Sequence, residues 1–201
     1  INLGIPMSLQ GAWLAEHIKA TMAAHPVEHG DMITYFCKVP STSDLARYFR
    51  LMLQPTHRLT MVYFSDDAML AVAGSSGVRW YNVDIKSCDK SHTEAMFESA
   101  DRVFDHPAFH ILTAQCAVDI QVTDYNAPWR KVVLRPRHRV LMSGSTLTTL
   151  FNNFSYMWIA HSLDAAHVTD AASIRAAGRQ VGYILDVEEC ELFEDLQFLK
   201  H

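Results

Sequence analysis

The sequence predicts an α+β fold in which an antiparallel sheet is backed by helices, and two features indicate it. The first is a set of three short apolar runs with the length and the β-branched or aromatic content of buried strands, at 59–64, 68–73 and 78–83. The second is a set of longer segments with helical spacing or capping residues, at 8–24, 45–53, 91–104 and 146–165. Only three polar residues separate the first two runs, so we expect them to form a hairpin.

Capping residues set the expected ends of these helices. Ser8 is a candidate N-cap of the first helix. Ser43-Asp44 opens the second, which Pro55 ends. In the third, Ser91 and Glu94 have the spacing of a capping box.

Composition narrows the class of protein. The 201 residues are 49% hydrophobic and suffice for one domain with a substantial core. A net charge of -5 argues against binding of nucleic acid by bulk electrostatics, although a local basic groove stays possible. The four cysteines show no metal-ligand spacing and are expected to be buried free thiols, as in a reducing compartment. No apolar run is long enough to span a membrane.

Acidic residues gather at the ends of the predicted strands. Asp66 and Asp67 occupy the hairpin turn, and Asp84 follows the third strand. Adjacent carboxylates raise each other's pKa unless a cation compensates them, so a divalent metal is expected there. Three carboxylates from two elements could hold a pair of metal ions. Two alternatives stay open: a solvated turn at Asp66-Asp67, and ordinary helix capping by Asp84 and Asp89.

A second polar group follows in the chain. Ser143-Gly144 forms a turn that opens the helix over 146–165. On that helix Thr148 and Asn152 are four residues apart and share one face, so both side chains can reach the same ligand. Capping is the alternative, but Asn152 lies well past the first turn, where asparagine is unfavourable.

Basic and histidine residues suggest weaker sites. A basic cluster suits phosphate binding, and its alternative is an exposed strand edge protected by charge; its members are Arg130, Lys131, Arg135, Arg137, His138 and Arg139. His17, His25 and His29 could share a metal ion only if the turn at Pro26 brings them together, and otherwise they are surface histidines.

The order of these motifs resembles the palm of viral RNA-dependent RNA polymerases, in the permuted C-A-B order of permutotetraviruses and birnaviruses. Ser65-Asp66-Asp67 matches motif C, Asp84 and Asp89 match motif A, and Ser143-Gly144, Thr148 and Asn152 match motif B. The resemblance implies a palm with an RRM-like core, part of the fingers, and a strand near Leu196. The segments are an N-terminal helical segment 1–57 on the fingers and palm side, and the palm 58–201 with motif C 59–73, motif A 79–92, a fingers-like insertion 105–138, motif B 142–165, motif D 170–187 and motif E 196–201.

The resemblance also implies an activity, template-directed RNA synthesis by nucleotidyl transfer with two Mg²⁺ or Mn²⁺ ions. Asp66 and Asp84 would hold the ions, with Asp67 nearby. The 2′-hydroxyl of the incoming nucleotide would be read by Asp89, Thr148 and Asn152, and a reverse transcriptase is expected to have a bulky residue in place of Asp89. The loop at Ser143-Gly144 would adjust to template and nucleotide, Lys200 would lie near the primer terminus, and phosphate or RNA would be bound by Arg135, Arg137 and Arg139. The implied partners are RNA template and primer, nucleoside triphosphates, and the remaining fingers and thumb, in the host cytoplasm or the virion.

Some residues depart from the family pattern. Ser65 replaces the commoner glycine of motif C, and it is small enough for the same turn. In motif D a general-acid lysine often follows the turn, but here the sequence 186–191 is acidic, and Arg179 holds its proton too tightly to replace it. No thumb and no basic triphosphate-binding motif are evident, so the chain by itself is expected to polymerise poorly. The alternative function is a palm-like binding or assembly module whose acidic hairpin is a structural metal site.

Overall fold

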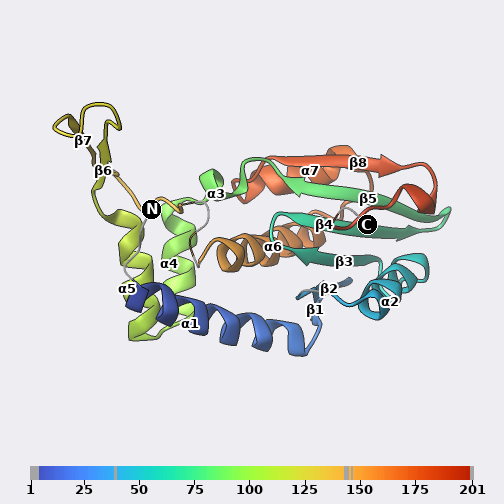
Figure 1. The fold of residues 1–201 in the computed structure, drawn as a ribbon. Coiled ribbons are helices and arrows are strands. Elements are labelled where there is room, and N and C mark those ends of the chain that lie inside the picture. The colour runs from blue at the N-terminus through green and yellow to red at the C-terminus, as the bar shows by residue number, and fades with distance from the viewer. Residues whose placement is uncertain (1–4, 39, 143–144, 146, 200–201) are drawn as a thin grey trace.

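The computed structural model describes residues 5–38, 40–142, 145 and 147–199, and the side chains of 11–38 and of the later ranges. Six strands form one mixed sheet in the order β1-β2-β3-β4-β5-β8, and β6 and β7 form a separate hairpin (Figure 1). The strands are β1 Val27–His29, β2 Met32–Phe36, β3 Leu59–Phe64, β4 Asp67–Gly74, β5 Gly77–Ile85, β6 Ile120–Thr123, β7 Lys131–Leu134 and β8 Leu185–Cys190. The helices are α1 Ile5–Ala24, α2 Thr42–Leu53, α3 Cys88–Ser91, α4 Glu94–Val103, α5 Pro107–Ala114, α6 Thr148–Ala165 and α7 Ala171–Gln180, with 3₁₀ turns at Gln115–Ala117 and Phe193–Asp195.

The predicted α+β class and the predicted hairpin are confirmed. β3 and β4 pair antiparallel, with Phe64 opposite Asp67, and β4 continues into an antiparallel pair with β5. Ser65 has φ 59 in the turn, a left-handed conformation that favours glycine. This conformation explains why a glycine would suit the position, and it shows that serine is tolerated there.

The sheet differs from the prediction in three strands. It is mixed, because β2 runs parallel to β3, and neither β1 nor β2 was foreseen. The strand expected near Leu196 is wrong: within 191–199 the described chain has only a 3₁₀ turn, and β8 is the strand that pairs with β5. Leu196 and Phe198 are buried all the same, packed against the sheet as irregular chain. The hydrophobic residues near the C-terminus therefore mark a covering segment.

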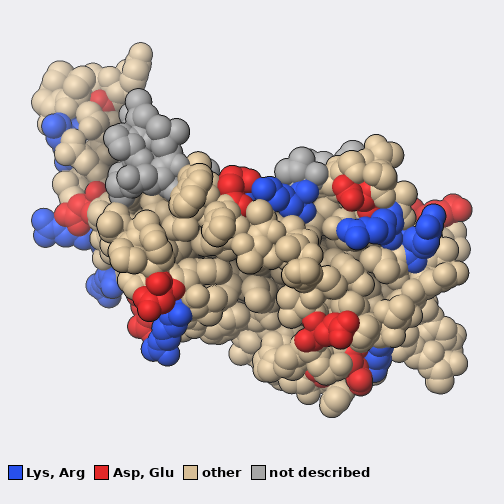
Figure 2. Space-filling view, turned by 90° about the horizontal axis from the view of Figure 1, so that it is seen from below, with Lys and Arg blue, Asp and Glu red and all other residues tan. Residues whose placement is uncertain are grey.

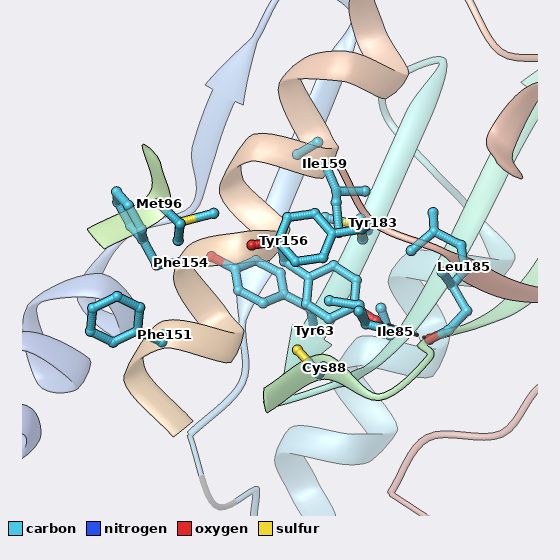
Figure 3. Packing of buried hydrophobic residues seen from close by; sticks show 14 of the residues in the cluster. Tyr63, Ile85, Cys88, Met96, Phe151, Phe154, Tyr156, Ile159, Tyr183 and Leu185 are labelled. Carbon is cyan, nitrogen blue, oxygen red and sulfur yellow. Dashed lines mark hydrogen bonds between the residues drawn. The ribbon is translucent and has the colours of Figure 1, made fainter. Parts of the chain in front are cut away.

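Each face of the sheet has its own core. On one face, large side chains of the sheet pack against α6 and α7; Figure 3 shows Tyr63, Tyr156, Ile159 and Tyr183 meeting there. On the other face, a smaller core joins the sheet to α2 and to the segment at Leu196 and Phe198. The helix expected over 91–104 does not back the sheet, since α4 packs with α5 away from it (Figure 1); α7 takes that place.

Several predicted helix caps are corrected. α1 begins at Ile5, so Ser8 is not its N-cap. The N-cap of α2 is Ser41, which forms a capping box with Asp44. Ser91 lies inside the short α3, where its hydroxyl donates to the carbonyls of Lys86 and Ser87. The capping box expected for Ser91 is therefore absent, and α4 starts after Thr93.

The insertion between motifs A and B ends in an arm. α5 and the turn after it lead into the β6–β7 hairpin, which projects from the body (Figure 1). Val122, Val132 and Leu134 are about half exposed on the hairpin, and Trp129 near its tip is 79% exposed. A two-stranded hairpin with one apolar face is marginally stable unless something covers it.

The base of the arm is held by Arg139. Its side chain pairs with Glu94 at 2.7 Å and with Asp101, and its guanidinium lies over the Phe97 ring at 5.0 Å. Only 14% of the side chain is exposed. Arg139 therefore joins the chain after the arm to α4, and phosphate binding by this residue would first have to break two ion pairs.

Replacing Arg139 by alanine is expected to destabilise the chain by about 1–3 kcal/mol, between the values for exposed and for buried ion pairs. Thermal and urea unfolding measure this loss. Arg137→Ala is the matched control, because Arg137 is exposed and forms no ion pair with the described residues; it should change stability by less than about 0.5 kcal/mol. Equal stability of the two variants would refute the anchoring role.

The cysteine prediction is confirmed, since all four are buried and free. Among the described residues, no helix combines the length and the apolar character needed to cross a membrane.

Candidate active site

Three carboxylates stand side by side on adjacent strands. Asp67 on β4 is paired with Asp84 on β5, and Asp84 is paired with Asp186 on β8. Residues directly opposite each other in antiparallel strands project to the same face of the sheet. By alternation with Met69 and Cys190, this is the face opposite α6 and α7. The hairpin turn and the end of the third predicted strand thus lie side by side in the sheet, and Asp186 extends the row.

Asp66 occupies the turn beside this row and its side chain is exposed. Its carbonyl oxygen accepts hydrogen bonds from the Ile85 amide at 3.0 Å and from the Tyr156 hydroxyl at 2.7 Å. Tyr156 also donates toward the carbonyl of Val83 at 3.1 Å. A buried tyrosine of α6 therefore ties the turn that carries Asp66 to strand β5 from the helix-covered face of the sheet.

The row of carboxylates is electrostatically strained. The pKa of Asp84 is raised to about 6. Partial burial contributes most to the rise, and repulsion from Asp66, Asp67 and Asp186 adds to it. Burial also raises the pKa of Asp67, although a hydrogen bond of 2.7 Å from the Leu199 amide and one from the Ala68 amide oppose the rise. Uncompensated negative charge of this kind favours binding of a cation.

The donor set suits Mg²⁺ or Mn²⁺, which prefer carboxylate oxygens. Asp67, Asp84 and Asp186 line a pocket of about 240 Å³ together with Glu188 and Arg175. Within the described residues, no three His, Cys, Asp or Glu side chains are arranged as ligands around one point.

The three motifs also meet through hydrogen bonds. Asn152 of α6 donates from Nδ2 to Asp89 Oδ1 at 3.2 Å and to Ser65 Oγ at 3.3 Å. Its neighbour Asn153 accepts from the Ser65 amide at 2.6 Å. Residues of motifs A, B and C, as many as 88 positions apart in the chain, are thus joined at one point. Asp89 and Asn152, both expected to contact the nucleotide, therefore lie together, and Asn152 is buried, with 2% exposure.

The other predicted residues of motifs B and E are placed only in part. Thr148 begins α6, and its hydroxyl donates to the Met142 carbonyl at 3.1 Å, so it is engaged in holding the preceding loop. Ser143, Gly144 and Lys200 lie outside the described residues.

The predicted basic cluster is dispersed. Arg135 pairs with Asp119 at 3.1 Å on the exposed arm, while Arg139 is held by Glu94 and Asp101. On the face shown in Figure 2, acidic and basic side chains are scattered in small groups with wide uncharged areas between them. Arg137 on the arm is exposed, and with Arg135 it stays a candidate for contact with phosphate.

The histidines predicted as a possible metal group do not share one. His29 instead approaches Asp164 at 3.2 Å and His161 at 3.0 Å, both on α6. No contact joins His29 to His17 or His25 in the described structure.

Sequence reasoning missed five residues of the site: Asp186, His92, Asn153, Tyr156 and Tyr183. One signal could have found Asp186, because Leu185 and Val187 are buried and Asp186 and Glu188 are exposed, the alternation of a half-buried strand. The other four act through contacts between distant segments, for which the local sequence carries no signal.

Comparison of the chain with protein-family models and with curated protein sequences found no match.

Proposed function

We propose that this chain is the palm of an RNA-dependent RNA polymerase, with its motifs in the order C-A-B, and that it carries out nucleotidyl transfer. One observation carries the proposal. Asp67, Asp84 and Asp186 form a row on the sheet face opposite α6 and α7, and Asn152 joins Asp89 to Ser65, next to the turn that carries Asp66. Metal-binding carboxylates next to polar groups that could read a sugar are what template-directed nucleotide addition requires.

Asp66 and Asp84, with Asp67 beside them, would hold two divalent ions, and Asp186 extends the same acidic row. When bound, such ions activate a primer 3′-hydroxyl and stabilise the leaving pyrophosphate. The protein contributes orientation: strand pairing fixes Asp84 against Asp67, and Tyr156 fixes the turn that carries Asp66. Asp89 would meet the ribose of a nucleotide whose phosphates the carboxylates hold.

Primer extension tests the proposal. In the full natural protein in which this chain occurs, we expect incorporation of nucleoside triphosphates on a primed RNA template with Mg²⁺ or Mn²⁺, and loss of incorporation in Asp66→Ala. Asp124→Ala on the exposed arm is the control. Incorporation that survives Asp66→Ala at the wild-type rate would exclude the catalytic assignment.

Replacement of Asp89 by alanine is expected to relax discrimination against deoxynucleotides by about tenfold to a hundredfold. A site that hydrogen-bonds a hydroxyl rejects the analogue lacking it mainly because its polar groups are left unpaired, and alanine removes that penalty. Competition between a ribonucleotide and its deoxy analogue in primer extension measures the change. Selectivity equal to that of the wild type would remove Asp89 from the site.

A second candidate function is a palm-like binding or assembly module without catalysis. The observation that favours it is that Thr148 and Asn152, expected to contact a nucleotide, already bond within the chain, and Asn152 is only 2% exposed. Calorimetry of Mn²⁺ binding and primer extension, measured on the same protein, separate the two functions. A module with a structural metal site binds the ion and incorporates no nucleotide.

A further inference from the structure

A buried histidine determines which way the Asn152 amide points. His92 Nε2 lies 3.0 Å from Asn152 Oδ1, and Asn152 Nδ2 lies 3.2 Å from Asp89 Oδ1. The Asp89 oxygen accepts from the amide nitrogen, so the amide oxygen must face His92. The orientation of Asn152 therefore follows from its two neighbours.

The amide oxygen of Asn152 in turn determines the tautomer of the imidazole. Burial lowers the pKa of His92, so the neutral ring carries one hydrogen, and Asn152 Oδ1 can only accept it from Nε2. Nδ1 is then an acceptor, 3.2 Å from the Tyr183 hydroxyl and 3.3 Å from the Ser155 hydroxyl. Because Ser155 already donates to the Phe151 carbonyl at 2.9 Å, Tyr183 is the better donor to Nδ1.

The network is enclosed by the core. His92 is 6% exposed, and Asn152, Ser155 and Tyr183 are buried at least as deeply. Tyr183 lies among the side chains of the main core, near Tyr156 (Figure 3). An unpaired polar group in such surroundings costs free energy, so the members hold one another in a single arrangement.

We propose that His92 and Tyr183 are positioning residues for ribose selection. They hold Asn152 so that its amide hydrogens face Asp89 and Ser65, and they leave Asp89, which is only partly buried, as the group that meets the 2′-hydroxyl of a ribonucleoside triphosphate. This inference rests on the proposed function. It connects the end of motif A, through the motif B helix, to the turn before β8.

Two substitutions with a matched control test the network. His92→Phe keeps a ring of similar size but leaves Asn152 Oδ1 without a donor, and we expect discrimination between ribo- and deoxynucleotides to fall about tenfold. Tyr183→Phe should have a smaller effect of about twofold to fivefold, since Ser155 can still donate to His92. Tyr81→Phe is the control: Tyr81 is buried and its hydroxyl has no partner within the described residues, so selectivity should not change.

The readout separates positioning from a general loss of structure. A purely structural role would lower kcat for both nucleotides equally, whereas loss of positioning changes their ratio of kcat/KM. ¹⁵N NMR of the wild-type histidines provides a test without catalysis, with His92 expected as the Nε2-protonated tautomer, and with more of the other tautomer in Tyr183→Phe.

The possible failures are distinguishable. Absence of incorporation by the wild type would overturn the polymerase proposal and this inference with it. Incorporation with unchanged selectivity in both His92→Phe and Tyr183→Phe would overturn this inference alone. An Nδ1-protonated His92 in the wild type would also overturn it, even if His92→Phe failed to fold.

Discussion

Asp84→Asn is expected to abolish nucleotide incorporation and, in the same protein, to raise the melting temperature at pH 7.5 without divalent ions. Asp84 stands between Asp67 and Asp186 on the central strand of three. Removing its charge relieves the repulsion that raises its pKa, so the fold gains stability. The same change removes a metal ligand, and we expect the incorporation rate to fall about a thousandfold or more.

Opposite changes in activity and stability distinguish a functional carboxylate from one that supports the fold. Primer extension and thermal unfolding are measured on the same preparations, with Glu98→Gln on the exposed side of α4 as the control. The control should leave both quantities near the wild-type values. A melting temperature lowered by Asp84→Asn would show that the carboxylate stabilises the sheet, and the strained-site interpretation would be wrong.

Stabilisation of the wild type by Mn²⁺ or Mg²⁺ is expected to increase between pH 5 and pH 7.5. The proton and the cation compete for Asp84, whose pKa is raised to about 6 from an ordinary 3.8. Above pH 6 the carboxylate is ionised and binds the ion without first losing a proton. At a hundred times the dissociation constant, the melting temperature should rise by about 5–10 °C.

Without metal, the same group gives the opposite dependence on pH. Because the folded pKa is higher than the unfolded one, the stability contributed by Asp84 is fully present below about pH 3.8 and is lost as pH rises through about 6. Thermal scans at several pH values, with and without Mn²⁺, measure both effects. In the Asp84→Asn variant, the gain in metal stabilisation between pH 5 and 7.5 should largely disappear. If the variant kept that gain, the ion would be bound by other ligands.

Local patterns predicted the elements whose residues carry their own signal. The hairpin at 59–74 was evident from two apolar runs and three polar residues. β8 was missed because Asp186, Glu188 and Glu189 conceal a strand whose buried residues are only Leu185, Val187 and Cys190. The strand near Leu196 was expected wrongly, because apolar residues that cover a sheet resemble those that form one.

The residues of the candidate site also divide into those that the sequence indicated and those that only tertiary contacts reveal. A resemblance in motif order nominated Asp66, Asp67, Asp84, Asp89 and Asn152, and in the structure Asp67 pairs with Asp84 while Asn152 bonds to Ser65 and Asp89. Nothing in the sequence indicated that Asn152 is buried and oriented by His92. A buried polar network depends on which distant groups satisfy each donor and acceptor, and spacing along the chain does not encode that pairing.

By itself, the sequence determined the α+β class, the acidic hairpin turn, and the order in which the polar motifs occur, because backbone periodicity and turn chemistry act over a few residues. Tertiary structure decided which strands are neighbours, and thus that Asp186 stands opposite Asp84 and that Tyr156 reaches the turn of Asp66. Strand order results from burial of two sheet faces at once, which is a property of the whole chain.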